Sequence, residues 1–353
     1  MNPWGIWAIW LLCCRLLVNV EVGGDLSLGR GFTERMRTFP GAAEAYFRPL
    51  REHLRGVDLS LANLEGCVRD RPGQPPIGVR YDLSFGPNTA RALGQTGFSA
   101  LGLANNHAGD ASGEGFDATL NILHDLGIRP VAGIERFDLH GTLVTVVALD
   151  YCRGRRLSLV NPEMGCTPAE SHGCDAICGN SDRSHRWKID ITSPKLRSRW
   201  VDRVRSLERE GPVIVFLHGG AEDCDEVSPD EITFFQELRA VGAAGVFGHH
   251  PHRIKLWSAP RSVFGTEASP LFISLGSVLF DRSRSPDCYG LLVRLTFWAG
   301  IHVRTTLFPV HISGRTYRPV VWPPWPFEIF LRSGEKKSSL LWSFTLFLMG
   351  FGK

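Results

Sequence analysis

Short apolar runs rich in valine, isoleucine and leucine recur along the chain and are separated by segments with helical periodicity. Apolar runs of about four to eight residues bounded by turn-forming residues are typical of buried strands. Strands that alternate with helices predict an α/β domain. The predicted strands comprise residues 18–22, 58–62, 100–104, 143–149, 213–217, 245–247 and 271–275.

Three segments between these strands have the pattern of helices. In residues 115–126, apolar positions recur at spacings of three and four, and Gly127 ends the pattern. Residues 194–209 have the composition of a charged surface helix. A third helix is predicted around Phe234 and Leu238, just before the strand that leads into the histidine-rich stretch.

The later part of the chain predicts a hairpin, a long loop and a tail. Residues 291–297 and 301–307 are joined by a short Trp-Ala-Gly connection, which indicates an antiparallel hairpin. Residues 151–190 are rich in Gly, Cys and Ser and have little periodicity, so we expect a long insertion loop, a type that is often functional or mobile. One domain is therefore expected over residues 18–312, followed by a proline-rich tail at 313–353.

The N-terminal residues 1–17 are rich in Trp and Leu but do not match a signal peptide fully. No positive residue precedes the apolar run, and the strand at 18–22 leaves little room for a cleavage site. An apolar leader, an inaccurate start and an export or anchor signal all stay open. Residues 340–351 are apolar but fewer than the roughly 20 residues of a spanning helix. We expect no full transmembrane span, with a cytoplasmic, membrane-associated or exported location.

Composition narrows the class of protein. With 353 residues, 43% of them hydrophobic and 21% charged, the chain can bury a sizeable core. The net charge of +3 is small, and no dense run of Lys or Arg occupies the central region. Both observations argue against a nucleic-acid-binding protein.

The nine cysteines are an odd number, which excludes a complete set of disulfides within one chain. Three of them, Cys166, Cys174 and Cys178, lie near His172 in the predicted loop. Their spacing matches no standard zinc-ribbon pattern, so reduced thiols or a single disulfide compete with a zinc site there.

Five of the predicted strands run into acidic, amide or imidazole side chains. In open α/β sheets, sites form beyond the carboxyl ends of the strands. The densest stretch, Gly-His-His-Pro-His at 248–252, places three imidazoles within four positions, and imidazole binds divalent metals. Two glycines before Asp25 would let the backbone approach a bound ion closely. The other strand ends carry Asn63 and Glu65, Asn105, Asn106 and His107, and His218.

Each of these strand ends has a simpler interpretation when taken alone. Asp25 could cap a turn, and the Asn105-Asn106 pair is common in turns. His218 could satisfy a loop carbonyl. Taken together, however, the simple interpretations require five coincidences in register with five strands, so we favour a metal site.

The same residues resemble those of the CapA-like family of poly-γ-glutamate capsule synthesis, which is related to calcineurin-like metallophosphoesterases. The resemblance spans about residues 18–312 and implies an α/β fold, a four-layer α/β/β/α sandwich with a metal centre at one edge. It is carried by Gly24-Asp25, Asn63-Leu64-Glu65, the Ala-Asn-Asn-His-Ala-Gly-Asp stretch at 104–110, His218-Gly219-Gly220-Ala221-Glu222, the stretch at 248–252, and Ser274-Leu275-Gly276 through Phe280-Asp281.

The resemblance implies ligands for two divalent metal ions, drawn from Mn, Fe or Zn. Asp25 and His252 would bind the first metal, and Glu65 would bridge the pair from a position where phosphoesterases usually have aspartate. The second metal would be bound by Asn106, His218 and His250.

The resemblance also implies roles for residues that surround the metals. His107 would be the catalytic residue, protonating a leaving group or stabilising the transition state. Side chains that contact the substrate or support the ligands would be Asn63, Asn105, Asp110, Glu222 and His249.

Three positions depart from the pattern. Ser27 stands where phosphoesterases usually carry a histidine, so the first metal has few protein ligands. Gly219 stands where the family commonly has tryptophan, and Ser277 replaces the usual asparagine. The departures affect metal occupancy and hydrolytic activity more than the fold.

The resemblance implies a metal-dependent hydrolase of phosphoesters or γ-glutamyl amides, linked to capsule synthesis. An alternative is a non-catalytic component that binds or anchors an anionic polymer for the capsule machinery, with the metals supplying positive charge. A structural metal in a degenerate fold is a third interpretation.

Overall fold

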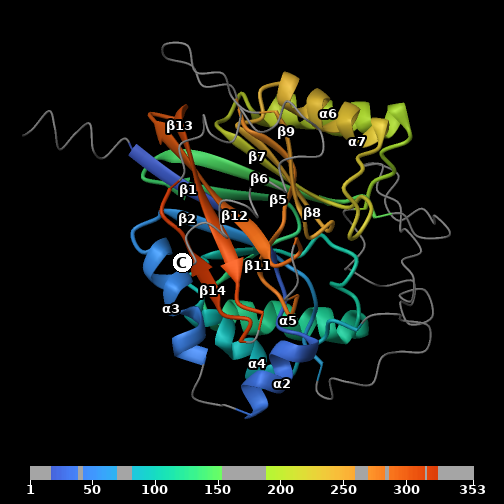
Figure 1. Ribbon diagram of the computed structural model, residues 1–353. Helices are drawn as coiled ribbons and strands as arrows, with labels where there is room; N and C mark the ends of the chain where they lie inside the picture. The colour runs from blue at the N-terminus through green and yellow to red at the C-terminus, as the bar shows by residue number, and fades with distance from the viewer. Residues whose placement is uncertain are drawn as a thin grey trace, which may run out of the picture.

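A computed structural model describes residues 17–38, 43–69, 82–152, 188–258, 269–282, 286–314 and 316–324. These residues form a mixed α/β structure with two β-sheets and helices packed against them (Figure 1). The α/β class predicted from the sequence is therefore confirmed.

The first sheet has eight strands in the order β14-β13-β12-β1-β2-β3-β4, with β11 paired to β1. Strands β1 to β4 run parallel, and β12 joins β1 antiparallel. The strands are β1 (Leu17–Leu26), β2 (Leu59–Leu64), β3 (Ala100–Gly102), β4 (Arg129–Val131), β11 (Ser277–Leu279), β12 (Tyr289–Trp298), β13 (Ile301–Ile312) and β14 (Pro319–Val321).

The second sheet has six strands in the order β5-β6-β7-β8-β10-β9. Its inner strands β6, β7, β8 and β10 are parallel, and the edge strands β5 and β9 are antiparallel to their neighbours. The strands are β5 (Gly133–Leu139), β6 (Thr142–Asp150), β7 (Val213–His218), β8 (Gly245–His249), β9 (Ile254–Ser258) and β10 (Leu271–Leu275).

The helices lie in two groups at opposite ends of the view in Figure 1. In one group, α3 packs on β14 and α5 on β4; in the other, α7 packs on β8 and β10 and contacts α6. A capping box between Ser228 and Glu231 begins α7, and the Ser193 side chain caps α6. The helices are α2 (Arg30–Thr38), α3 (Ala43–Leu54), α4 (Pro87–Ala90) with the 3-10 helix η2 (Arg91–Gln95), α5 (Ser112–Asp125), α6 (Pro194–Leu207) and α7 (Pro229–Ala240).

The core lies around and between the two sheets. Strands β1 and β8 contact each other across the sheets, as do β4 and β6. Every residue of β7 is buried, which explains why its sequence is a continuous apolar run rather than an alternating one.

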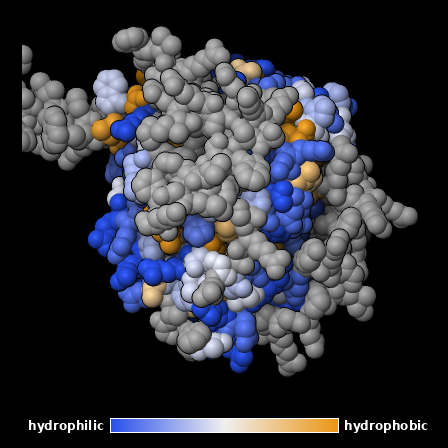
Figure 2. Space-filling model, viewed as in Figure 1, coloured by the Kyte–Doolittle hydropathy of each residue, from blue (hydrophilic) through white to orange (hydrophobic). Residues whose placement is uncertain are grey.

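On the face shown in Figure 2, the described surface is largely hydrophilic. Five large apolar side chains of the described residues are exposed, namely Leu17, Trp298, Ile301, Val303 and Val320.

All seven predicted strands, the three predicted helices and the hairpin are present, with ends that shift by a few residues. The elements that the pattern did not predict are mostly short or at sheet edges. Strand β5 carries charged residues, and α3 contains Pro49, which obscures its helical pattern. Within the predicted tail, Pro319–Val321 forms the edge strand β14.

Some predictions fall on parts of the chain outside the described residues. These include residues 1–16, most of the insertion at 151–190, and the end of the tail from residue 325. The Cys166, Cys174 and Cys178 group lies there as well. Among the described helices, none is both long and apolar enough to cross a membrane.

The parallel strands bring the predicted strand ends together. In the first sheet, Asp25 of β1 pairs with Asn63 of β2. In the second sheet, Asp150 of β6 pairs with His218 of β7, which pairs with His249 of β8. Because parallel strands end at the same edge of a sheet, each sheet presents a row of polar side chains at its carboxyl edge.

A carboxyl group at the opposite end of these strands allows a prediction about pH. Glu208 follows α6, and its Oε1 accepts a hydrogen bond of 2.9 Å from the Val213 backbone N–H. Burial raises the pKa of Glu208 to about 7. Because the folded protein holds this proton more tightly than the unfolded chain, stability falls as pH rises from about 4.5 to about 7.

We expect Glu208→Gln to remove that fall, since glutamine keeps the acceptor oxygen and carries no charge. The wild type should lose about 1–2 kcal/mol of unfolding free energy between pH 5 and pH 8 that the variant does not lose, allowing for partial solvent screening. Urea denaturation at both pH values measures this. The exposed neighbour Glu210, changed to Gln, is the control; equal pH dependence in the wild type and Glu208→Gln would contradict the prediction.

Candidate metal centre

The fully buried carboxylate of Glu65 lies between two imidazoles, just after β2. Its Oε1 is 3.4 Å from Nε2 of His218, and its Oε2 is 3.5 Å from Nε2 of His252. Among the described residues, neither oxygen has a hydrogen-bond partner. A buried carboxylate without hydrogen-bond partners is costly, so these two oxygens fit a site for a cation.

Asp25, at the end of β1, is also fully buried, but its oxygens have partners. Its Oδ1 accepts a hydrogen bond of 2.8 Å from the Asn63 amide, and its Oδ2 accepts one of 3.1 Å from the His250 backbone N–H. The same Oδ2 lies 3.3 Å from Nδ1 of His252. Asp25 therefore connects the first sheet to the histidine loop of the second.

The two asparagines after β3 have different positions. The Oδ1 of Asn106 is 2.8 Å from Nε2 of His218, on the same side of that ring as Glu65. Asn105 instead donates to Oδ1 of Asn63, at 3.1 Å, and to the Leu64 carbonyl, at 2.8 Å. Asn105 thus supports the strand end, while Asn106 faces the imidazole.

His107 lies at the partly exposed rim of the same loop, with 16% of its side chain exposed. Its Nδ1 is 2.8 Å from Oδ2 of Asp110, and that oxygen also accepts a hydrogen bond from the Leu83 backbone N–H. A carboxylate on Nδ1 orients the ring and selects its tautomer. Asp110 is therefore a positioning residue for His107.

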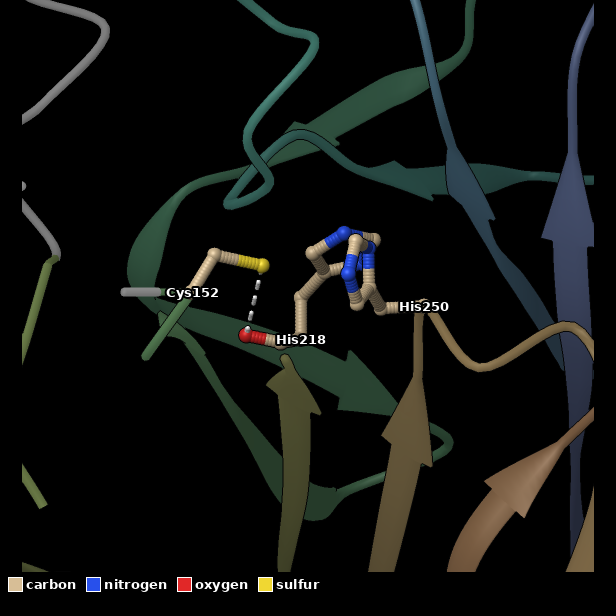
Figure 3. Close-up of side chains that lie close together, drawn as sticks. All are labelled: Cys152, His218 and His250. Atoms are coloured by element: carbon tan, nitrogen blue, oxygen red, sulfur yellow. Dashed lines mark hydrogen bonds between the residues drawn. The ribbon is translucent and has the colours of Figure 1, made fainter. Parts of the chain in front are cut away.

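The three imidazoles of the 249–252 loop do not share one environment. His250 faces His218, with ring centroids 4.9 Å apart (Figure 3), and lies 6.3 Å from the His252 ring. The buried Nδ1 of His250 has no hydrogen-bond partner among the described residues. His249 instead stacks on Phe216 and its Nε2 lies 3.2 Å from the Gly23 carbonyl, so it links the two sheets.

The buried environment of His218 and His250 favours the neutral form of both imidazoles. Burial, followed by the neighbouring imidazoles, lowers the pKa of His218 well below its usual value and that of His250 to about 3. Burial, with the Asp25 charge as the next cause, raises the pKa of Glu65 well above its usual range. For Asp25, burial acts to raise the pKa, but the hydrogen bond and charge of His252 outweigh it and lower the pKa. Neutral imidazoles are the form that binds metals.

Two groups of donor atoms could hold a metal ion, each with its ligand atoms within 4.8 Å of one another. One group has two oxygens and a nitrogen, from Asp25, Glu65 and His218. The other joins Cys152 to His218 and His250. With the unpartnered Glu65 oxygens and His250 nitrogen, these donors fit a divalent transition metal.

Glu222 stands at the rim rather than inside the cluster. Its side chain is 36% exposed, and its Oε1 lies 3.9 Å from Nε2 of His252. It forms an ion pair with Arg282, which also pairs with Asp223. The charge of Arg282 therefore lies close to the candidate site.

The positions that depart from the family pattern have other partners. The Ser27 hydroxyl accepts a hydrogen bond from the Gly29 backbone N–H, and the Ser277 hydroxyl lies 3.3 Å from Nδ1 of His252. At Gly219, a Cβ would lie 2.6 Å from the Tyr151 ring. The Tyr151 ring occupies the space next to residue 219, which leaves no room there for tryptophan.

The glycine before Asp25 packs closely against the backbone at Gly276. A Cβ at Gly24 would lie 2.1 Å from the Gly276 carbonyl oxygen, which accepts the Asp25 backbone N–H at 2.8 Å. Glycine is required at position 24 because the backbone of β1 packs against residues 275–276, and the close approach of this backbone to a bound ion stays a prediction.

Sequence reasoning missed Cys152, although a signal existed. The predicted strand at 143–149 becomes β6, and the residues that follow it reach the same edge as His218. The rule that polar residues after strands form the site applies to Cys152 as well. Arg282 and Lys188 carried no such signal, because their partners lie far away in the sequence.

Two ligand candidates are held in strained backbone conformations. His250 has φ of 95° and His252 has φ of 56°, in the left-handed region that favours glycine. Such strain costs about 1–3 kcal/mol and is typical of functional sites.

We expect metal-free His250→Gly to be about 1 kcal/mol more stable to urea than His250→Ala, because glycine adopts this φ without strain. The same two substitutions at the exposed His124 in α5 should have the opposite order, because alanine favours helices. A more stable alanine variant at position 250 would show that the backbone is not strained there.

Comparisons with known proteins show which family the chain belongs to. The family model described as bacterial capsule synthesis protein PGA_cap matches residues 19–282. The capsule biosynthesis protein CapA of Bacillus anthracis is 23% identical over 269 residues, which cover 75% of this chain and 60% of that protein. The PGA biosynthesis protein CapA of Bacillus subtilis (strain 168) is 20% identical over 336 residues, which cover 92% of this chain and 80% of that protein.

The matched range includes all the candidate metal ligands, from Asp25 to His252, and both sheets contribute to it. The chain spans about 60% of the length of the B. anthracis relative. The match of the family model to residues 19–282 places this chain in the bacterial capsule synthesis protein PGA_cap family, as a CapA-like protein.

Proposed function

We propose that the chain is a metal-dependent hydrolase of phosphoesters or γ-glutamyl amides that acts in the synthesis of a capsule polymer. The observation that carries the proposal is Glu65, whose two unpartnered oxygens each face a different imidazole. The two facing sheets with helices packed on them support a four-layer sandwich of the metallophosphoesterase type.

The two oxygens of the Glu65 carboxylate, Oε1 and Oε2, would each contact a different metal ion. On the Oε2 side, Asp25 and His252 would hold one metal ion, with Ser277 supporting the His252 ring. On the Oε1 side, His218 and its neighbours Asn106 and His250 would hold a second ion. Bound metals of this kind polarise a phosphoryl or carbonyl oxygen and acidify water.

The residues around the ligands orient them and move protons. The Asn63 amide contacts both Asp25 and Nδ1 of His218, which fixes the two ligands relative to each other. His107 would transfer a proton to the leaving group from Nε2, because Asp110 holds its Nδ1. Its position at the rim places the ring where a substrate can reach it.

The test is hydrolysis by purified protein supplied in turn with Mn²⁺, Fe²⁺ and Zn²⁺. Chromogenic phosphomonoester, phosphodiester and γ-glutamyl anilide substrates cover the proposed classes. We expect activity with at least one combination, and a fall in kcat of about 10²–10⁴-fold in His107→Gln with the bound metal unchanged. His140→Gln is the matched control, since His140 is an exposed imidazole that also pairs with a carboxylate, Asp58.

If the protein hydrolysed none of these substrates with any of the metals, the result would contradict the proposed hydrolase function. One observation favours a second function in that case. The Ser27 side chain is engaged in a local turn, so the first metal position has few protein ligands, which suits binding more than catalysis. We then expect the protein to bind an anionic capsule polymer through its metals, and binding of poly-γ-glutamate should survive His107→Ala but not His250→Ala.

A further inference from the structure

We propose that Cys152 is a sulfur ligand in the metal position formed with His218 and His250, and that this position therefore selects a thiophilic metal such as zinc. The proposal rests on the proposed metal centre and assigns a further residue to it. With a sulfur ligand on one side, the metal position next to Oε1 of Glu65 and the position next to Oε2 would prefer different ions.

The geometry brings the thiol to the imidazoles. In Figure 3, the sulfur of Cys152 points toward the His218 and His250 rings, and the three ligand atoms lie within 4.8 Å of one another. The Sγ contact with the His218 carbonyl is long, at 3.9 Å, so it is a weak hydrogen bond. Small side-chain rotations would bring these donors to the distances of a tetrahedral site.

Two further observations support a metal ion at this point. The buried Nδ1 of His250 has no hydrogen-bond partner among the described residues. Nearby, Oδ1 of Asn106 lies 2.8 Å from Nε2 of His218. The Cys152 sulfur and the two imidazole nitrogens form a sulfur–nitrogen donor set, which is typical of zinc sites.

The backbone around Cys152 is held firmly in place. The Cys152 N–H donates to Oδ1 of Asp150, and the Tyr151 N–H donates to the His218 carbonyl, each at 2.8 Å. Asp150 also pairs in register with His218 across β6 and β7. The backbone that carries the thiol is therefore held next to His218 at the carboxyl edge of the sheet.

The other described cysteines lack this setting. Cys67 accepts a hydrogen bond from the Ala111 backbone N–H, and Cys288 packs in a separate small apolar cluster. Cys224 lies in the loop before α7. Among the cysteines that the structure describes, Cys152 alone belongs to a group of possible metal ligands with imidazoles.

A sulfur ligand would make one of the two metal positions chemically softer than the other, so that the two prefer different ions. Thiolates favour Zn²⁺, Co²⁺ and Cd²⁺, whereas carboxylates favour harder ions such as Mn²⁺ and Mg²⁺. The side with Asp25, Glu65 and His252 is richer in oxygen, so the two positions should prefer different ions.

The experiment is titration of the metal-free, fully reduced protein with Co²⁺, followed by near-ultraviolet absorption. A cobalt–thiolate bond gives a sulfur-to-metal charge-transfer band that cobalt bound through oxygen and nitrogen does not give. We expect the band in the wild type and in Cys224→Ser, and its loss in Cys152→Ser. Zinc affinity in Cys152→Ser should fall at least about tenfold, since even residues that only support ligands have effects of that size.

The outcomes distinguish this proposal from the proposed function. Protein that binds Co²⁺ without the band, or a band that survives Cys152→Ser, would overturn the role of Cys152 alone. Protein that binds no Co²⁺ would overturn the metal centre as well. Should Cys152→Ser fold poorly, X-ray absorption of the zinc-loaded wild type decides: a sulfur neighbour at about 2.3 Å supports the proposal, and a shell of only nitrogen and oxygen overturns it.

Discussion

Replacing Glu65 by glutamine is expected to lower hydrolysis by about 10³-fold or more and, at the same time, to make the metal-free protein more stable. Activity falls because several kcal/mol of transition-state stabilisation depends on bound metals, and a neutral amide holds them poorly. Stability rises because burial and the nearby Asp25 charge disfavour the Glu65 carboxylate, as the raised pKa indicates. Glutamine has nearly the same shape and no charge.

Thermal unfolding at pH 8, with chelator and then with added metal, measures both effects. The wild type should gain stability on metal addition, and Glu65→Gln should gain little. Glu21→Gln is the matched control, because Glu21 is equally buried but is paired with Arg294 and His53. That variant should lose stability and keep its metal. A Glu65→Gln protein that binds metal like the wild type would contradict the bridging role.

Removal of the Lys188 charge is expected to lower the unfolding free energy by about 3–5 kcal/mol. The Lys188 ammonium lies 3.4 Å from Oδ2 of Asp150, and both side chains are almost fully buried, with 1% and 0% exposed. In Lys188→Met, the carboxylate of Asp150 would remain buried without its cation. The same carboxylate supports Cys152 through its other oxygen, so the damage is close to the metal centre.

Urea denaturation of Lys188→Met, Asp150→Asn and the double variant tests this pair. We expect the double variant to be more stable than Lys188→Met, because it leaves no unpaired buried charge. Arg205→Ala, which breaks an exposed pair with Asp202, should change stability by no more than about 0.5 kcal/mol. If Lys188→Met unfolds like the wild type, the pair contributes nothing to stability.

Much of the fold was predictable because its signals are local. The buried parallel strands, such as β7, are continuous apolar runs, and α7 begins with a capping box that can be read from adjacent positions. The position of the candidate site was also predictable. Parallel strands end at the same edge, so Asp25, Asn63 and His218, each at the end of an apolar run, were expected to meet there.

The roles of neighbouring residues within one motif were harder to predict. His249 and His250 are adjacent, but His249 stacks on Phe216 while His250 faces His218. The difference arises because β8 ends at His249 and the chain then turns with φ of 95° at His250. Spacing in the sequence cannot reveal such a turn, since a non-glycine residue rarely adopts it.

The amino-acid sequence by itself determined the α/β class, the main strands and helices, and the edge of the sheets where the candidate ligands lie. These properties depend on side-chain periodicity and strand direction, which neighbouring residues specify. Only the tertiary structure decided that Cys152 reaches the imidazoles, that Gly24 packs on Gly276 and that Lys188 pairs with Asp150. Those contacts depend on which strands lie side by side and how closely they pack, and burial then determines which charges need a partner.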